Sequence, residues 1–410
     1  MSLSVAASSS IHSRVSEACS DPYHGLPRVA VLAASSSSPS LVSAVAGYEQ
    51  IPANADDLST APKLTEDSLF SLWSCTKLVT VIAALQLVEQ GKVGLADDAS
   101  RWVPELKELK LVKGVMDDGE LELVENDAVV TVEMLITHTA GFTYEYADKY
   151  KAAMEKLGLT SPYAENATRE SVTKAPFINP PGKSWSYGTS NDWLALVISA
   201  ISGLTLGDYV QQNIFAPLGI DDMTYTNPLS RISISYAPKT PGDPYTFDAG
   251  RKFTQSINWG GTGLTGSPKS YLKILRMVLR GGLAEDGGRL LQEETVKVMF
   301  ENHLTNEQQL KDHAAFTKTG NDPWTHKKGE QLEGVGYGYG GTLTGEGMPS
   351  GRAKGAMTWS GYANTFWVID RVKDVAFLVW TNHVPHSMPA LFDLWEAVEP
   401  KIYAGLPPHQ

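Results

Sequence analysis

Apolar positions along the chain predict secondary-structure elements in three blocks. In the first block, residues 11–20 carry a weak helical period. Two apolar runs, 28–34 and 41–47, have the length and composition of strands and are separated by a serine-rich turn. A polar connection follows at 54–65. This block therefore predicts a helix followed by a β-hairpin.

The second block is mainly helical. Its first helix contains residues 78–88, the longest apolar run of the chain, which predicts a buried position. Thr131 and Gly203 stand where a helix start and a helix end are expected. Helical spacing recurs in four further segments, at 131–136, 144–157, 192–201 and 206–217.

Strands return in the third block. Ser267 and Pro268 predict the start of a helix that runs to Leu279, and a polar stretch at 302–332 predicts a long surface loop. Residues 335–343 and 355–379 then alternate like strands, and residues 391–403 form a closing amphipathic helix.

This order predicts that the two chain ends share one sheet with flanking helices, and that a helical domain is inserted between them. We place the domain limits at 1–66, 67–255 and 256–410 and expect the active site in the cleft. A chain of 410 residues is long for one compact core, which agrees with this division.

Composition and charge exclude several classes of protein. The formal net charge of −12, without a basic patch, argues against a nucleic-acid partner. Only two cysteines occur, so a disulfide scaffold is not expected. The first ten residues lack the basic and apolar regions of a secretory signal, and the longest apolar run is too short to span a bilayer. We expect a soluble, cytoplasmic protein without a membrane partner.

A serine with a lysine three residues later, on the same face of a helix, occurs at Ser74/Lys77, Ser171/Lys174 and Ser270/Lys273. Context separates these pairs. Ser171 lies in a polar segment stopped by Pro176, and Ser270 falls within the predicted helix 268–279, on what we expect to be its solvated face. Only Ser74 opens a strongly apolar helix.

Ser74 has the setting of a nucleophile in acyl transfer. A helix N-terminus offers unpaired N–H groups and a positive dipole end to a developing anion. A serine also needs a base, which here would be Lys77 with a lowered pKa or an ionised tyrosine. Tyr187 is the candidate tyrosine, because a neighbouring ammonium would help it lose its proton. Taken alone, such a tyrosine is usually a packing residue.

Five segments together carry a family resemblance: 74–77, 135–141, 181–188, 216–223 and 260–266. In order and spacing they resemble the class C β-lactamase-like serine hydrolases, which include penicillin-binding proteins, family VIII carboxylesterases and fungal acyltransferases of the lovastatin side-chain type. The resemblance covers about residues 11–403. It implies an α+β fold of the β-lactamase/transpeptidase type, an antiparallel sheet flanked by helices with an inserted, mainly helical domain. It also implies a catalytic group of Ser74, Lys77 and Tyr187 that needs neither a cofactor nor a metal.

The third motif of this family is a Lys-Thr-Gly triplet or a variant of it on a strand beside the site. The literal triplet at 318–320 precedes Pro323 in a polar stretch, so we reject it. The better match is Trp359, Ser360 and Gly361. By this resemblance Ser360 and Gly361 line the pocket, and the backbone N–H groups of Tyr362 and Ser74 form the oxyanion hole.

One departure from the lactam-cleaving members concerns the residues after Tyr187. Those members usually show Tyr-x-Asn, whereas Thr189 holds the third place here and Asn191 lies two residues further on. Asn191 is retained as a candidate substrate-binding residue. Loss of both the amide and the triplet lysine favours an ester or thioester over a lactam. Three aromatic residues are expected to form an apolar wall for a bulky acyl or alcohol group: Trp73, Trp259 and Trp359.

Other chemistry receives less support. His138 is interpreted as a structural histidine, and Cys75 as a buried packing residue. The chain lacks a Gly-x-Ser-x-Gly elbow, and His303, His313 and His326 lack metal-ligand spacing.

Three functions remain open. The first is acyl transfer from an ester or thioester, with an acyl carrier or acyl-CoA as one form of donor, and with water or an alcohol as acceptor. The second is a β-lactamase or D-amino-acid peptidase. The third is a non-catalytic scaffold of the same fold.

Overall fold

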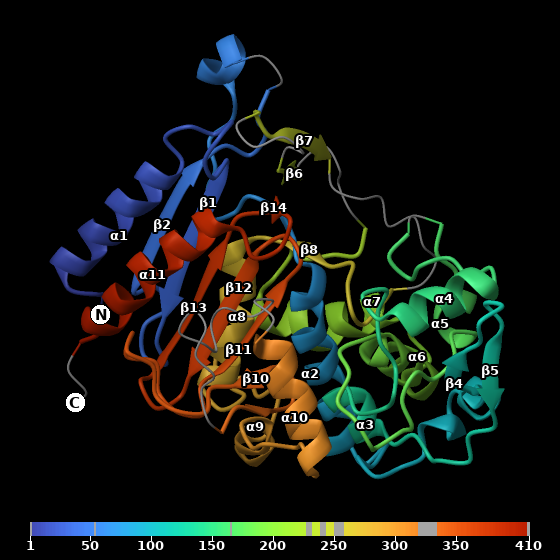
Figure 1. Ribbon diagram of the computed structural model, residues 1–410. Coiled ribbons are helices and arrows are strands. Elements are labelled where there is room, and N and C mark those ends of the chain that lie inside the picture. The colour runs from blue at the N-terminus through green and yellow to red at the C-terminus, as the bar shows by residue number, and fades with distance from the viewer. Residues whose placement is uncertain are drawn as a thin grey trace.

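A seven-stranded antiparallel sheet lies between two layers of helices in the computed structural model, which describes residues 2–52, 55–164, 166–226, 232–237, 243–249, 258–318 and 334–407 (Figure 1). Its strands follow the order β2-β1-β13-β12-β11-β10-β9. Their bounds are Arg28–Ala34 (β1), Val42–Gly47 (β2), Gly336–Tyr337 (β9), Thr342–Leu343 (β10), Met357–Gly361 (β11), Thr365–Asp370 (β12) and Val375–Trp380 (β13).

Both ends of the chain build this sheet, as the sequence predicts. Strand β1 pairs antiparallel with β13, so that Ala30 lies opposite Trp380 across more than 300 residues of sequence. Every pair of neighbouring strands in the sheet is antiparallel. The expected fold class is therefore confirmed.

Helices cover both faces of the sheet. Side chains alternate along a strand, so Val31 and Phe377 face α1 (Val5–Ala18) and α11 (Pro389–Ala404), whereas Leu32 and Leu378 face the opposite core. That second core lies against α2 (Thr76–Glu89) and α8 (Pro268–Leu279). Because strands β1 and β13 are buried on both faces, their sequences are almost wholly apolar.

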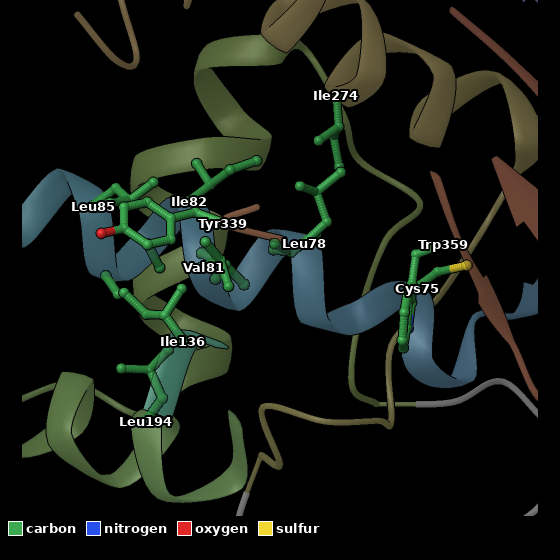
Figure 2. Close-up of a cluster of buried hydrophobic side chains, with 14 of the residues drawn as sticks. Cys75, Leu78, Val81, Ile82, Leu85, Ile136, Leu194, Ile274, Tyr339 and Trp359 are labelled. Atoms are coloured by element: carbon green, nitrogen blue, oxygen red, sulfur yellow. The ribbon is translucent and has the colours of Figure 1, made fainter. Parts of the chain in front are cut away.

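The nucleophile-bearing segment runs through the middle of the molecule. Twelve of the fourteen residues of α2 are buried, which explains why its sequence is apolar all round. Figure 2 shows Leu78, Val81 and Ile82 of this helix packed among side chains from neighbouring helices. Helix α2 is therefore held by helices on several sides, so its first turn has a firm position.

The region between the two sheet-forming ends is mainly helical. Thr131 and Gly203 cap helices as expected: the Thr131 hydroxyl accepts from the Met134 N–H, and Gly203 adopts a left-handed conformation with φ 72°. The α-helices of this region are α3 (Val132–Thr137), α4 (Asp148–Lys156), α5 (Glu170–Thr173), α6 (Ser190–Ser202) and α7 (Leu206–Val210). The predicted segment 206–217 continues past α7 as a π-helical stretch, Gln211–Phe215, and a 3-10 turn, Ala216–Leu218.

Smaller elements complete the fold. Helix α9 spans Glu293–Met299. Two short strands, β3 (Phe70–Ser71) and β8 (Thr265–Gly266), pair beside the nucleophile. A separate sheet contains β14 (His383–Val384), β6 (Ser233–Tyr236) and β7 (Thr246–Ala249).

One sequence prediction fails, and one hairpin was missed. Part of the expected surface loop at 302–332 is helix α10 (Glu307–Phe316), whose N-terminus is capped by Asn306. This helix buries two of its side chains, Gln309 and His313, and both are polar, so it carries little apolar periodicity. A hairpin of β4 (Leu111–Val115) and β5 (Leu121–Val124) was not predicted at all.

The domain limits remain predictions, and the limit at 255/256 lies outside the described residues. Among the described residues, no single helix has the length and apolarity needed to cross a membrane. One sharply bent pair, 190–202 with 206–218, meets those criteria on length and composition only.

Candidate active site

Ser74 lies in a single 3-10 turn, Trp73–Cys75, that leads directly into α2. The residue before it, Trp73, has a φ of 47°, which is unusual for an aromatic side chain. The indole of Trp73 packs in a small buried cluster with Ile234, Ala363 and Val384, which holds the backbone in this conformation. Packing of the preceding residue therefore helps to place Ser74.

The three predicted catalytic side chains meet at one point. The Lys77 Nζ lies 3.1 Å from the Ser74 Oγ. The Tyr187 hydroxyl donates to the same oxygen over 2.6 Å. Ser74 thus has both a nitrogen base and a phenol within hydrogen-bonding distance, as acyl transfer through a serine requires.

The environment of Lys77 favours its neutral form. The side chain is buried, and this desolvation lowers its pKa to about 7, against the smaller opposing effect of the Asp192 carboxylate. The Nζ also donates to the Gly261 carbonyl over 2.8 Å. A lysine held in this way can accept a proton near neutral pH.

Asp192 was not predicted to belong to the site. Its Oδ1 accepts from the Gly261 N–H over 2.8 Å, and Lys77 donates to the carbonyl of the same residue, so Gly261 links the two side chains. Burial raises the pKa of Asp192 to about 6, although the nearby ammonium opposes this rise. Asp192 is therefore the carboxylate that acts on the charge of Lys77.

The expected ease of Tyr187 ionisation is wrong in direction. Burial raises the pKa of Tyr187 above its usual value, and its hydrogen bond to Ser74 only partly offsets this effect. Tyr187 is consequently a neutral phenol that donates to Ser74, and Lys77 is the better proton acceptor.

His138 holds the backbone on both sides of Tyr187. Its carbonyl accepts from the Ser186 N–H over 2.9 Å, and its Nδ1 accepts from the Gly188 N–H over 3.4 Å. Burial lowers the pKa of His138 well below its usual range, so the ring is neutral and Nδ1 can accept. His138 is therefore a structural residue, as interpreted from the sequence, and its structural role is to accept hydrogen bonds from backbone N–H groups on both sides of Tyr187.

Gly188 allows the chain to approach closely beside Tyr187. A Cβ at this position would lie 2.3 Å from the Thr143 Cα, so any larger residue would displace the loop. The Tyr146 hydroxyl donates to the Tyr187 carbonyl from the other side.

A cavity of about 490 Å³ opens at Ser74. Its walls are largely aromatic, which suits an apolar substrate body. Polar groups lie among the rings at a few positions, and most of the lining comes from three parts of the chain, namely 144–163, 359–362 and the nucleophile turn. The lining residues are Trp73, Ser74, Tyr144, Glu145, Tyr146, Ser161, Tyr163, Tyr187, Thr262, Phe316, Trp359, Ser360, Tyr362 and His386.

Two of the three residues of the triplet chosen from the sequence line the cavity, and Gly361, which was also expected to line it, does not. Trp359 and Ser360 on β11 line the cavity, and the Trp359 ring lies 5.0 Å from that of Tyr187. Gly361 lies deeper, because a Cβ there would come within 2.3 Å of the Leu72 carbonyl oxygen. The glycine therefore permits β11 to approach the nucleophile turn. In the rejected triplet at 318–320, residues 319 and 320 lie outside the described residues.

Two predicted pocket residues lie elsewhere. Asn191 is buried, and its side-chain amide donates to the Leu135 carbonyl over 2.9 Å, so it ties α6 to α3. Trp259 is 1% exposed and belongs to the large hydrophobic core. Successive helical residues point about 100° apart, so Asp192 reaches the site while Asn191 does not.

The competing serines and Cys75 have structural contacts. The Ser171 hydroxyl accepts from the Thr168 N–H, and Ser270 is buried, so the expected solvated position of Ser270 is wrong. The Cys75 thiol is buried and donates to the Thr365 carbonyl over 3.0 Å. Among the described residues, no cluster of three or more His, Cys, Asp or Glu side chains could hold a metal ion.

The residues missed from the sequence come from distant segments. His386 and Phe316 reach the cavity from a loop after β14 and from the end of α10. Of the missed site residues, only Asp192 could have been found from the sequence, because it follows Tyr187 by five residues and directly precedes Trp193. Tyr144 and Tyr146 were assigned to a helix, which begins instead at Asp148.

Comparison with known proteins shows that the chain is similar to acyltransferases and esterases. Residues 29–399 match the sequence model of the family described as Beta-lactamase. The chain is 31% identical over 373 residues to monacolin J acid methylbutanoyltransferase from Aspergillus terreus, with 85% of each chain covered. It is 33% identical over 327 residues to lovastatin esterase from Penicillium rubens, covering 76% of this chain and 78% of the esterase.

A solved structure agrees with this placement. Unliganded simvastatin synthase from Aspergillus terreus superposes with a TM-score of 0.81 at 28% identity, and the match covers 97% of this chain and 98% of the synthase.

Proposed function

Because the chain belongs to the β-lactamase family of serine enzymes, we propose that it transfers acyl groups from an ester or thioester through an acyl-enzyme on Ser74. The observation that carries this proposal is the convergence of the Lys77 Nζ and the Tyr187 hydroxyl on the Ser74 oxygen, at 3.1 Å and 2.6 Å. Relatives named as acyltransferase and esterase support the same chemistry.

In the first step, neutral Lys77 accepts the Ser74 proton while the oxygen attacks the carbonyl carbon. The lowered pKa of Lys77 supports this assignment. The Tyr187 hydroxyl is hydrogen-bonded to the same oxygen and, as a neutral phenol, can give its proton to the departing alkoxide or thiolate. The alcohol or thiol then leaves protonated, and Lys77 passes the proton that it took from Ser74 to the Tyr187 oxygen.

Charge develops on the carbonyl oxygen during this step. We assign the oxyanion hole to the backbone N–H groups of Ser74, within the nucleophile turn, and of Tyr362, directly after the third motif. Close packing of Gly361 against the Leu72 carbonyl supports this assignment, because it brings the two segments together.

In the second step, water or an alcohol attacks the acyl-enzyme. The same Lys77 and Tyr187 pair takes up the proton of the acceptor and returns it to Ser74. Acceptance by water gives an esterase, and acceptance by an alcohol gives an acyltransferase.

Esters and thioesters are favoured over lactams because the third motif lacks its lysine. Trp359 occupies the place of the triplet lysine, and its ring packs on Tyr187 as an apolar wall. A panel of p-nitrophenyl esters, an acyl-CoA thioester and a chromogenic cephalosporin tests the proposal, with Ser74→Ala as matched control. We expect turnover of the esters and the thioester, lost in the variant; turnover of the cephalosporin alone would overturn it.

The same proposal extends to the acyl donor and to the cellular location of the enzyme. An acyl carrier or acyl-CoA is a suitable donor, because the cavity is open at Ser74 and its walls accept an apolar chain. We place the enzyme in the cytoplasm, where such thioesters occur.

A further inference from the structure

His386 reaches the cavity from the loop after β14, and the mechanism above does not use it. Its Nε2 lies 3.0 Å from the hydroxyl of Ser360 on β11. Its Nδ1 lies 2.7 Å from the hydroxyl of Ser387. Both ring nitrogens therefore have a hydroxyl partner, and Ser360 and His386 both line the cavity that opens at Ser74.

The imidazole is held firmly in this position. Asn364, which is fully buried, donates to the Pro385 carbonyl over 2.8 Å and accepts from the Ser387 N–H over 2.8 Å. One side chain thus binds the backbone on both sides of His386. The Phe366 ring packs 5.2 Å from the imidazole. Such bracing from residues in and before β12 is more than a solvent-exposed histidine would need.

The ring is uncharged under ordinary conditions, because burial lowers the pKa of His386 to about 4. A neutral imidazole has one donor nitrogen and one acceptor nitrogen. In either tautomer, Ser360 uses part of its hydrogen-bonding capacity on His386 and keeps the rest for the cavity. The free part is its proton when Nε2 donates, and its lone pairs when Nε2 accepts.

Lys77 and Tyr187 lie beside the Ser74 oxygen, where they take up the proton of the acceptor in the second step. A further polar group is therefore needed to hold the oxygen of that acceptor beside the acyl-enzyme. Ser360 directly precedes Gly361, which packs against the nucleophile turn, and Trp359 on its other side packs against Tyr187. The Ser360 hydroxyl is thus an oriented polar group close to the reacting centre, in a cavity with mainly aromatic walls.

Resting on the proposed function, we infer that His386 is a positioning residue that orients the Ser360 hydroxyl to bind the hydroxyl group of an uncharged alcohol acceptor. The pair increases transfer to the alcohol relative to hydrolysis. The acceptor class is an alcohol with an apolar or aromatic body, which matches the cavity walls.

The experiment measures the ratio of transfer product to hydrolysis product, with p-nitrophenyl butyrate as donor and benzyl alcohol as acceptor. This ratio does not depend on the fraction of folded enzyme or on the rate of acylation. Ser360→Ala and His386→Phe should lower it by about 5- to 20-fold, the range for loss of one oriented hydrogen bond. His386→Gln, whose terminal amide can reach Ser360, should retain most of the ratio. Ser171→Ala, a distant serine, serves as the matched control.

Three results would overturn the inference. One is an unchanged ratio in both Ser360→Ala and His386→Phe. Another is a loss in His386→Gln as large as that in His386→Phe, which would indicate simple packing. A third is fluorophosphonate labelling of Ser360 in Ser74→Ala, which would make the pair a second nucleophile. Failure of the proposed function is distinguishable, because the unaltered enzyme would then release no nitrophenol.

Discussion

Lys77 and Asp192 bind opposite ends of the same residue: the Lys77 Nζ donates to the Gly261 carbonyl, and the Asp192 carboxylate accepts from the Gly261 N–H, each over 2.8 Å. The carboxylate is buried and close enough to favour the ammonium form of Lys77, without forming a direct ion pair with it. This arrangement moderates the effect of burial, which on its own would lower the lysine pKa further.

Replacement of Asp192 should therefore shift the pH dependence of acylation. Asp192→Asn keeps an acceptor for the Gly261 N–H but removes the negative charge, so the pKa of Lys77 should fall. The acid limb of the kcat/KM profile should move to lower pH by on the order of one unit. Steady-state kinetics from pH 5 to 9 measures this shift. A midpoint that stays in place or rises would show that Asp192 does not act on the charge of Lys77.

Lys77 also links stability to pH. Its folded-state pKa of about 7 lies below the ordinary value of 10.5, so the unfolded chain binds more protons between these values. The free energy of unfolding should consequently rise with pH across this window, by at most about 1.4 kcal/mol per unit. Urea titrations of the wild type and Lys77→Met test this prediction. The variant should lose the lysine's share of the slope; identical slopes would contradict the assignment.

His138 should matter through the position of Tyr187. Asn tolerates the left-handed backbone found at this residue, φ 60°, and its side-chain oxygen approximates Nδ1. His138→Asn should thus keep most of kcat, whereas His138→Ala should lower it by about 10- to 100-fold through misplacement of the phenol. KM should change less than kcat. Equal losses in both variants, matched by equal losses in melting temperature, would reduce His138 to a packing residue.

Two tryptophans predicted for the same wall should behave differently. Trp259 lies in the core, so Trp259→Ala should lower the free energy of unfolding by about 3–5 kcal/mol without changing the preference among acyl chain lengths. Trp359 lines the cavity, so Trp359→Ala should shift that preference towards bulkier esters. Denaturant titration and a p-nitrophenyl ester series separate the two. A changed preference among acyl chain lengths in Trp259→Ala would show that Trp259 contacts the substrate.

The sequence predicts the centre of the site better than its surroundings. Ser74 and Lys77 are three residues apart on one helical turn, so local spacing is enough to place them together. Tyr187 was found by its segment and by family resemblance. Its protonation could not be read in the same way, because burial by rings from several segments decides it.

The remaining site residues depend on long-range packing. Asp192 acts on Lys77 only because Gly261 lies between them, and His386 reaches Ser360 only because Asn364 fixes its loop. Asn191 was retained as a candidate by analogy with the Tyr-x-Asn motif of lactam-cleaving members, but the rotation along α6 turns it towards α3. The contacts of Asp192 and His386 with their partners leave no pattern in the sequence. The sheet built from both chain ends does leave a pattern, because strands buried on both faces are continuously apolar.

Covalent catalysis by Ser74 can be observed by intact-mass analysis after rapid quenching of a reaction with p-nitrophenyl butyrate. We expect one butyryl adduct per chain, located on the peptide that contains Ser74 and absent in Ser74→Ala. An adduct of full stoichiometry in Ser74→Ala, or rapid turnover that survives this substitution, would contradict it.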